Sequence, residues 1–174
     1  MQITEFHYIK ATKKQEGYFA IPELDRHKSS AAQFINLTNL DIHLTKPTAF
    51  LYVDGFSISQ AESGVARSAS NSFQVALKTG SSYIAHEWIH TFHNRELLCH
   101  VDIISSTCAA GIQAIWEAQR LLDSGTCQEV IIIGGERTTE DTLRLFRELR
   151  IPINCGDGFI FMRVQPGVQV TDVQ

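Results

Sequence analysis

The sequence lacks several features that would assign a function directly. It contains no GxGxxG pattern and no phosphate-binding P-loop, so nucleotide binding has no support. No apolar run approaches the about 18 to 20 residues that span a bilayer. The net charge of −4 gives no electrostatic reason to bind nucleic acid or an anionic membrane. The first residues do not resemble a secretory signal, so we expect a cytoplasmic protein.

Cysteine and histidine are unevenly placed. The four cysteines, Cys99, Cys108, Cys127 and Cys155, form no CxxC pair, which indicates neither a zinc site nor a disulfide framework. Reduced thiols in the cytoplasm are the simpler interpretation. All seven histidines precede Cys108, and the last of them is His100.

The chain of 174 residues is long enough for one domain with a substantial core, so we expect a single domain over residues 1–174. Apolar segments of strand length alternate with segments of helical pattern, and residues 10–30 read as a loop. The expected strands cover 3–9, 48–53, 97–104, 128–133 and 159–164. The expected helices cover 30–37, 64–78, 83–94, 109–122 and a segment that begins at 138. This alternation predicts an α/β fold with a largely parallel sheet covered by helices.

Cys108 lies where the strand 97–104 gives way to the helix 109–122. The first turn of a helix offers unpaired N–H groups and the positive end of the helix dipole, which favour a thiolate. Small residues follow the cysteine, Ala109, Ala110 and Gly111, and leave its sulfur uncrowded. The alternative is a buried, unreactive cysteine that packs the helix against the sheet.

Three segments in order resemble the β-ketoacyl synthases, the condensing enzymes of the thiolase-like superfamily. VDIISSTCAAG at 101–111 is similar to their nucleophile strand and turn, and VIIIGGE at 130–136 to the strand that follows. GDGFIF at 156–161 is similar to their Gly-Asp-Gly strand. The resemblance implies the N-terminal half of such an enzyme, a thiolase-like half with a five-stranded mixed sheet in the order βαβαβαββ, covered by helices.

The resemblance also implies a chemistry. Cys108 would take up an acyl group as a thioester from an acyl carrier protein or acyl-CoA, without a cofactor, in fatty-acid-like or secondary-metabolite (polyketide) biosynthesis. The histidines that drive condensation lie in the second half of the family's proteins, and Asn154, the one asparagine after Cys108, cannot replace them. We therefore expect a homodimer, or a heteromer with a histidine-bearing half. Residues 97–106 are expected to form the contact with the second copy or with the complementary half.

Two other functions remain open. One is a non-catalytic partner or scaffold subunit that keeps the thiolase fold. The other is a zinc peptidase, because His86-Glu87-Trp88-Ile89-His90 is a literal HExxH whose histidines share one face of a helix. His93 adds an imidazole near that face, but no histidine after His100 offers a third ligand. The conceivable acidic third ligands are Glu117, Glu136 and Glu140. We therefore expect no metal at this motif.

Two smaller expectations concern packing. Cys99 alternates with Val101 and Ile103, which predicts that its side chain lies in the core. Gly134 and Gly135 are expected to end their strand, with turn formation or close packing as their role.

Overall fold

The structure is a computed structural model. It describes residues 1–15, 18–23, 30–54, 81–106, 109–136, 138, 140–150 and 155–167. The expected helix 64–78 lies outside these residues, as do Thr107, Cys108 and Asn154.

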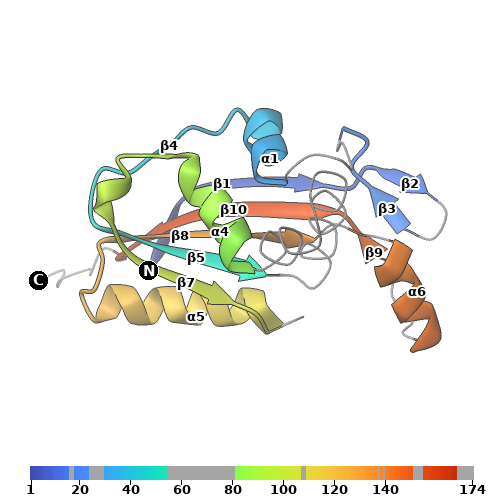
Figure 1. Cartoon of the computed structure of the whole chain (residues 1–174). Coiled ribbons are helices and arrows are strands. Elements are labelled where there is room, and N and C mark those ends of the chain that lie inside the picture. The colour runs from blue at the N-terminus through green and yellow to red at the C-terminus, as the bar shows by residue number, and fades with distance from the viewer. Residues whose placement is uncertain are drawn as a thin grey trace, which may run out of the picture.

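A five-stranded mixed sheet forms the centre of the molecule (Figure 1). Its strands, in spatial order, are β1 (Gln2–Lys10), β10 (Gly158–Gln165), β8 (Glu129–Glu136), β5 (Thr48–Asp54) and β7 (Leu98–Ile104). β10 runs antiparallel to both of its neighbours, whereas β8, β5 and β7 are parallel to one another. The expected mixed sheet is confirmed.

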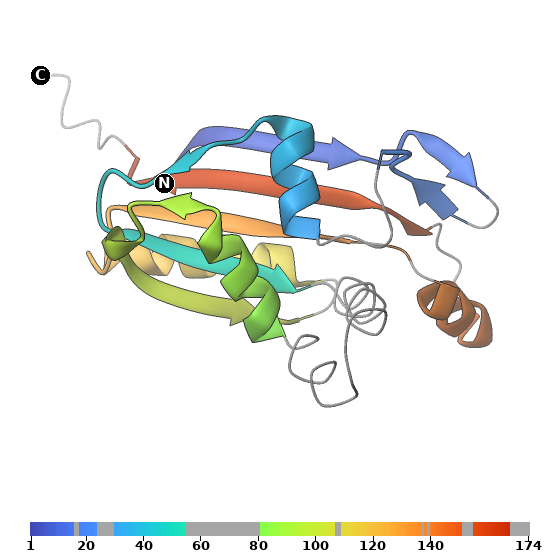
Figure 2. The same cartoon turned by 45° about the horizontal axis from the view of Figure 1, so that its top comes forward.

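Helices cover both faces of the sheet. α5 (Ala110–Asp123) lies on one face, and α1 (Ser30–Thr38) and α4 (Ser81–His90) lie on the other (Figures 1 and 2). The chain passes through β1, α1, β5, α4, β7, α5, β8 and β10 in that order, which matches the expected βαβαβαββ pattern. A further short helix, α6 (Glu140–Glu148), follows β8 along the chain and precedes β10.

The central strands are buried because both faces of the sheet are covered. Every residue of β5 is buried, and so are Val130 to Ile133 of β8. Parallel strands with helices on both sides need such continuous apolar runs, since neither face meets water. Two apolar clusters result, one under α1 and α4 around Phe34, Phe50 and Trp88, and one under α5.

Short peripheral strands lie within a segment that was expected to be a loop. Within 10–30, β2 (Lys13–Gln15) and β3 (Tyr18–Ala20) pair antiparallel, and β9 (Cys155–Gly156) joins β3 in parallel. The expected loop at 10–30 was therefore wrong in part. Three-residue strands carry too little periodicity to show in a sequence.

The expected helix 83–94 ends four residues early. α4 ends at His90, and the Thr91 hydroxyl donates to the carbonyl of Trp88 at 2.7 Å. Phe92 is buried and begins β6 (Phe92–His93), which runs parallel to β4 (Ile42–His43). A 3₁₀ turn, η1 (Arg95–Leu97), then leads into β7. Tertiary pairing with β4 overrides the local helical pattern.

Cys99 is exposed, which corrects its expected place in the core. β7 is the edge strand of the sheet, so only β5 pairs with it among the described strands. The pairing also shifts register between Thr48 and Ala49, opposite Cys99. Alternation alone could not reveal an edge position or a bulge.

Candidate functional site

The segment that contains Cys108 follows the carboxyl end of β7. The ends of three parallel strands meet there, because Val53 of β5 is paired with Ile104 of β7 and with Gly134 of β8. In open α/β sheets, ligands bind at the carboxyl ends of parallel strands. Cys108 itself lies outside the described residues, but the residues on each side of its segment, Ser106 and Ala109, are described.

No described side chain caps the start of α5. Ala109 is the N-cap and makes no side-chain cap hydrogen bond, while its N–H donates to the carbonyl of Ser106 at 3.1 Å. The Ser106 hydroxyl hydrogen-bonds to the amide oxygen of Gln113 rather than to the helix terminus. A Cβ added at Gly111 would meet nothing within 4 Å. The uncapped first turn keeps N–H donors for a negative charge.

Gly134 and Gly135 lie inside β8 and do not end it, which corrects the expected strand end. A Cβ at Gly134 would lie 2.6 Å from the Cβ of Val53, and one at Gly135 would collide with the carbonyl of Gly158. Close packing of neighbouring strands therefore explains both glycines. This close approach brings the carboxyl ends of β5 and β8 together with the start of β10.

Asp157, in the Gly-Asp-Gly motif, is a residue whose role sequence reasoning missed. Its carboxylate is 4% exposed and accepts hydrogen bonds from the N–H groups of Ile21 (3.1 Å) and Thr138 (2.8 Å). It thereby fixes the segment after β3 and the segment before α6 to the start of β10. An aspartate between two glycines, next to an apolar strand, was the available signal.

The two histidines of the HExxH motif lie together on α4. The Nε2 atoms of His86 and His90 are 3.2 Å apart, and their rings stack with centroids at 4.3 Å. Arg95 also approaches His90, with 2.9 Å between its guanidinium nitrogen and Nδ1. His93, expected near that face, instead pairs with Asp41 because β6 turns it toward β4.

No third ligand joins this pair within the described residues. Glu117, one conceivable ligand, is bound by Arg120 at 2.8 Å, which lowers the pKa of the Glu117 carboxyl. The side chains of Glu136 and Glu140 lie outside the description. The described side chains therefore do not assemble the donor set of a zinc peptidase.

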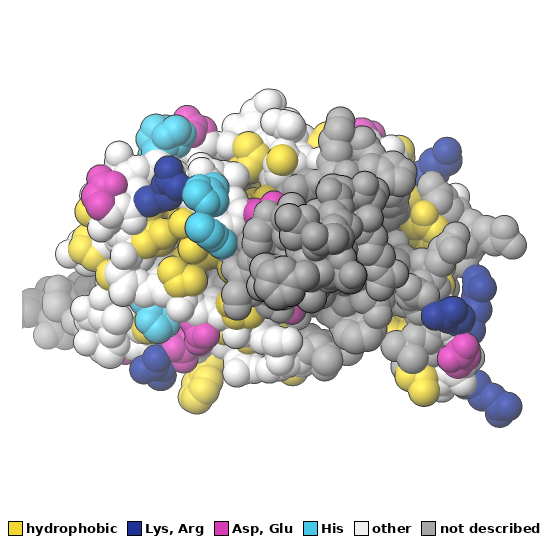
Figure 3. All heavy atoms as spheres, in the orientation of Figure 1, with side chains coloured by type: hydrophobic (Ala, Val, Ile, Leu, Met, Phe, Trp, Pro, Cys, Tyr) yellow, Lys and Arg dark blue, Asp and Glu magenta, His cyan; other side chains and the backbone are white. Residues whose placement is uncertain are grey.

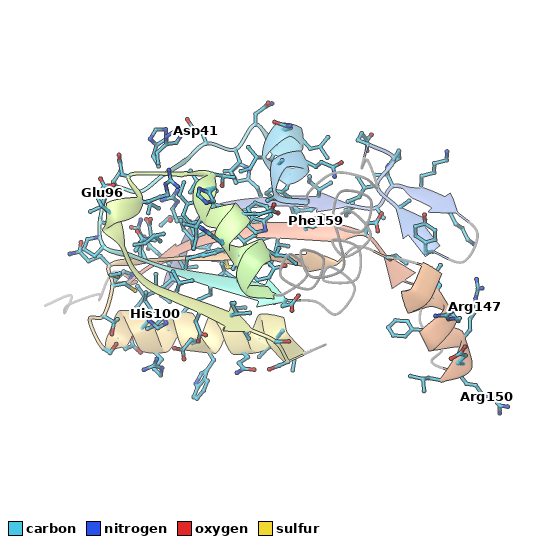
Figure 4. All side chains as sticks on the ribbon, in the orientation of Figure 1. Asp41, Glu96, His100, Arg147, Arg150 and Phe159 are labelled. Atoms are coloured by element: carbon cyan, nitrogen blue, oxygen red, sulfur yellow. The ribbon has the colours of Figure 1, made fainter. Side chains whose placement is uncertain are left out.

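Two other clusters of possible metal ligands occur among the described residues. One comprises Asp41, His43 and His93, and the other comprises His100, Asp102 and Glu117. Figure 4 shows Asp41 on the side of the sheet that carries α1 and α4, and His100 near α5. Hydrogen bonding from His43 lowers the pKa of Asp41.

Cys127, the other described thiol, lies in a buried environment. It is 4% exposed just before β8, and burial raises its pKa. A raised pKa keeps the sulfur protonated and a poor nucleophile.

No family model and no curated protein sequence matches the chain. Several solved ketosynthase structures do match it in fold. The ishigamide ketosynthase/chain length factor matches with a TM-score of 0.60 and 14% identity, over 90% of this chain and 54% of that one. A ketosynthase in complex with its chain length factor from Xenorhabdus doucetiae matches with a TM-score of 0.56 and 13% identity, over 95% of this chain and 79% of that one.

A third match, the ketosynthase from module 6 of the bacillaene synthase of Bacillus subtilis 168, has a TM-score of 0.49, 14% identity and coverage of 70% of this chain. The chain spans 22% of that protein and about half of the ishigamide protein. The first two likenesses show the fold, which is that of the thiolase-like ketosynthases. In the described part of the chain, no helix is long and apolar enough to cross a membrane.

Proposed function

We propose that this chain is the cysteine-bearing half of a β-ketoacyl synthase-like acyltransferase and carries acyl groups on Cys108. The observation that carries the proposal is the fold, which two ketosynthase structures share over 90% and 95% of this chain. The proposal is supported by the carboxyl ends of β5, β7 and β8, which meet where the chain leaves β7 and where open α/β sheets bind ligands.

The chemistry is acyl transfer between two sulfurs. The Cys108 thiolate attacks the carbonyl carbon of an acyl thioester, and the tetrahedral intermediate collapses as the carbon–sulfur bond to the donor breaks. The donor leaves as a thiolate and takes up a proton from water. Backbone N–H groups at the start of α5, which no described side chain caps, would stabilise the oxyanion.

The donor is an acyl carrier protein or acyl-CoA in fatty-acid-like or polyketide-type biosynthesis in the cytoplasm. Condensation with a second, malonyl-type thioester needs a base and an enolate stabiliser near the sulfur. The chain has no histidine after His100, so we propose that a histidine-bearing half supplies these groups.

The surface around α5 supports such a partner. Ile112, Ile115 and Trp116 are exposed on the side of α5 that faces away from its buried residues Ala114 and Ala118. The outward face of a surface helix is normally polar, and contiguous exposed apolar residues mark interaction sites. β7, the edge strand within the proposed contact 97–106, lies against this helix.

Acylation tests the proposal directly. The purified chain is incubated with acyl-CoA or an acyl-loaded carrier protein, and the protein and its peptides are weighed by mass spectrometry. We expect one acyl adduct on the peptide that contains Cys108. Cys108→Ala abolishes it, and the matched control Cys99→Ala, at an exposed thiol, retains it.

Adding malonyl-loaded carrier protein tests the need for a second half. We expect no β-ketoacyl product from this chain alone. A β-ketoacyl product formed without an added partner contradicts the need for a second half. An adduct that survives Cys108→Ala contradicts the assignment of Cys108 as the nucleophile. A chain that never acylates under conditions that acylate a ketosynthase favours the non-catalytic scaffold subunit.

A further inference from the structure

Asp41, His43 and His93 meet on the surface where β4 runs beside β6. Nε2 of His43 lies 2.8 Å from one oxygen of Asp41, and Nε2 of His93 lies 3.0 Å from the other. The two imidazole rings stack with centroids 4.3 Å apart and an interplanar angle of 13°. One ligand atom from each of the three residues lies within 4.8 Å of the other two.

The backbone holds this arrangement. His43 and His93 are register partners in the β4–β6 pair, so their side chains leave the same side of a two-stranded ribbon. The N–H of Leu44 donates to the carbonyl of His93 at 3.3 Å, and the Asn94 amide donates to the carbonyl of Leu44 at 2.9 Å. Strand pairing therefore holds His43 and His93 side by side, so their positions do not depend on flexible side chains alone.

The donor chemistry suits a transition metal. Two imidazoles and one carboxylate form a common ligand set for divalent ions such as zinc, with open positions for water. Tetrahedral zinc, with bonds of about 2.0–2.1 Å, spaces its ligand atoms by about 3.3 Å, close to the present distances from each Nε2 to the carboxylate. The two stacked rings would tilt so that both nitrogen lone pairs point at one ion.

We propose that Asp41, His43 and His93 form a surface binding site for a divalent transition metal, zinc in the first instance. The metal would take the place of the direct contacts between the two imidazoles and the carboxylate. It links the segment after α1 to the segment after α4, above the buried residues Ile42 and Phe92. All three ligands are exposed, so the metal would join the paired strands β4 and β6 at the surface.

The HExxH pair offers a built-in comparison. Figure 3 shows histidine side chains at several separate places on one half of the molecule. His86 and His90 are also exposed and also stacked, but no carboxylate joins them in a group of three among the described residues. A metal ion that binds any pair of exposed histidines would bind the His86–His90 pair as tightly as the His43–His93 pair.

Calorimetric titration of the purified, untagged chain with zinc chloride tests the proposal, with a reductant present that does not bind zinc. We expect one zinc per chain and a rise in Tm that grows with zinc concentration. His43→Ala and His93→Ala each weaken binding at least tenfold and remove the Tm shift. The control His86→Ala binds and shifts as the wild type does.

Cobalt(II) then identifies the donor atoms by its absorption spectrum. A site of two imidazoles and a carboxylate gives weak visible bands without the intense near-ultraviolet band of a cobalt–thiolate bond. Absence of saturable binding by the wild type overturns the proposal, and so does a thiolate band. Binding that His86→Ala abolishes, or that His43→Ala leaves unchanged, overturns it equally and assigns the metal to the HExxH pair or elsewhere.

Discussion

At the residue scale, Asp157 shows how a motif can be structural even where it resembles a functional signature. Asp157→Asn keeps the volume but replaces one acceptor oxygen with an NH₂ group facing a backbone N–H. We expect a loss of about 1–3 kcal/mol in the free energy of unfolding, measured by urea denaturation. The matched control Asp123→Asn, exposed on α5, changes it by less than about 0.5 kcal/mol. Equal effects of the two substitutions contradict the role of the buried hydrogen bonds.

Arg163 lies at the centre of an ion network at the opposite end of the sheet. Its guanidinium contacts Glu129 at 2.6 Å and Glu5 at 2.9 Å, and the Glu129 side chain is 1% exposed. Removing the arginine leaves a buried carboxylate with weaker partners, among them Lys46 at 3.9 Å. We expect Arg163→Met to cost about 3 kcal/mol of unfolding free energy, and the double variant with Glu129→Leu to recover part of it. A double variant that is less stable than Arg163→Met contradicts this account.

The thiols differ in the reactivity that their surroundings predict. Cys108 follows a strand and precedes an uncapped helix, Cys99 is exposed on an edge strand, and Cys127 is buried with a raised pKa. We expect iodoacetamide to modify Cys108 first and Cys127 last in the folded protein. Peptide mass mapping of a time course gives the order. Earlier modification of Cys99, Cys127 or Cys155 contradicts the activated nucleophile.

At the scale of the element, the two sides of α5 respond in opposite ways to added atoms. Ala114 is fully buried against the sheet, so Ala114→Leu overpacks the contact and costs about 1–3 kcal/mol. Gly111 is exposed, without atoms near its Cβ position and without a positive φ, so Gly111→Ala stabilises the helix by about 0.5–1 kcal/mol. Thermal or urea unfolding measures both. Two changes of the same sign contradict the orientation of α5.

The sequence predicted the elements that carry a clear apolar pattern of their own. β5, β8, α5 and β10 were expected within three residues of their observed bounds, because α5 and β10 repeat their buried residues at a regular period and β5 and β8 are apolar runs of strand length. β2, β3, β4 and β6 were missed, since strands of two or three residues depend on their partners. The exposure of Cys99 and the pairing of His93 with Asp41 likewise depend on contacts between distant segments. The expected nucleophile, Cys108, stays a prediction, because it lies outside the described residues.

At the scale of the whole molecule, the outward side of α5 exposes more large apolar side chains than the surface of a protein without a partner normally does. Ile112 is 76% exposed and Trp116 is 69% exposed on the same side of α5, and β7, which lies against α5, pairs with β5 alone among the described strands. An open edge strand offers unpaired N–H and C=O groups, and large apolar side chains beside it add a hydrophobic contact. Together they form a surface that another chain, or a second copy of this one, would cover.

This surface predicts self-association of the chain in the absence of a partner. Sedimentation over a concentration series should show a mass that rises with concentration. Trp116→Glu places a charge in the contact and should weaken association by about 2 kcal/mol or more, roughly thirty-fold. Leu149→Glu is the matched control, because Leu149 is 59% exposed just after α6 and away from α5. A wild-type chain that stays monomeric throughout, or an equal effect of Leu149→Glu, contradicts the assignment of the contact to α5 and β7.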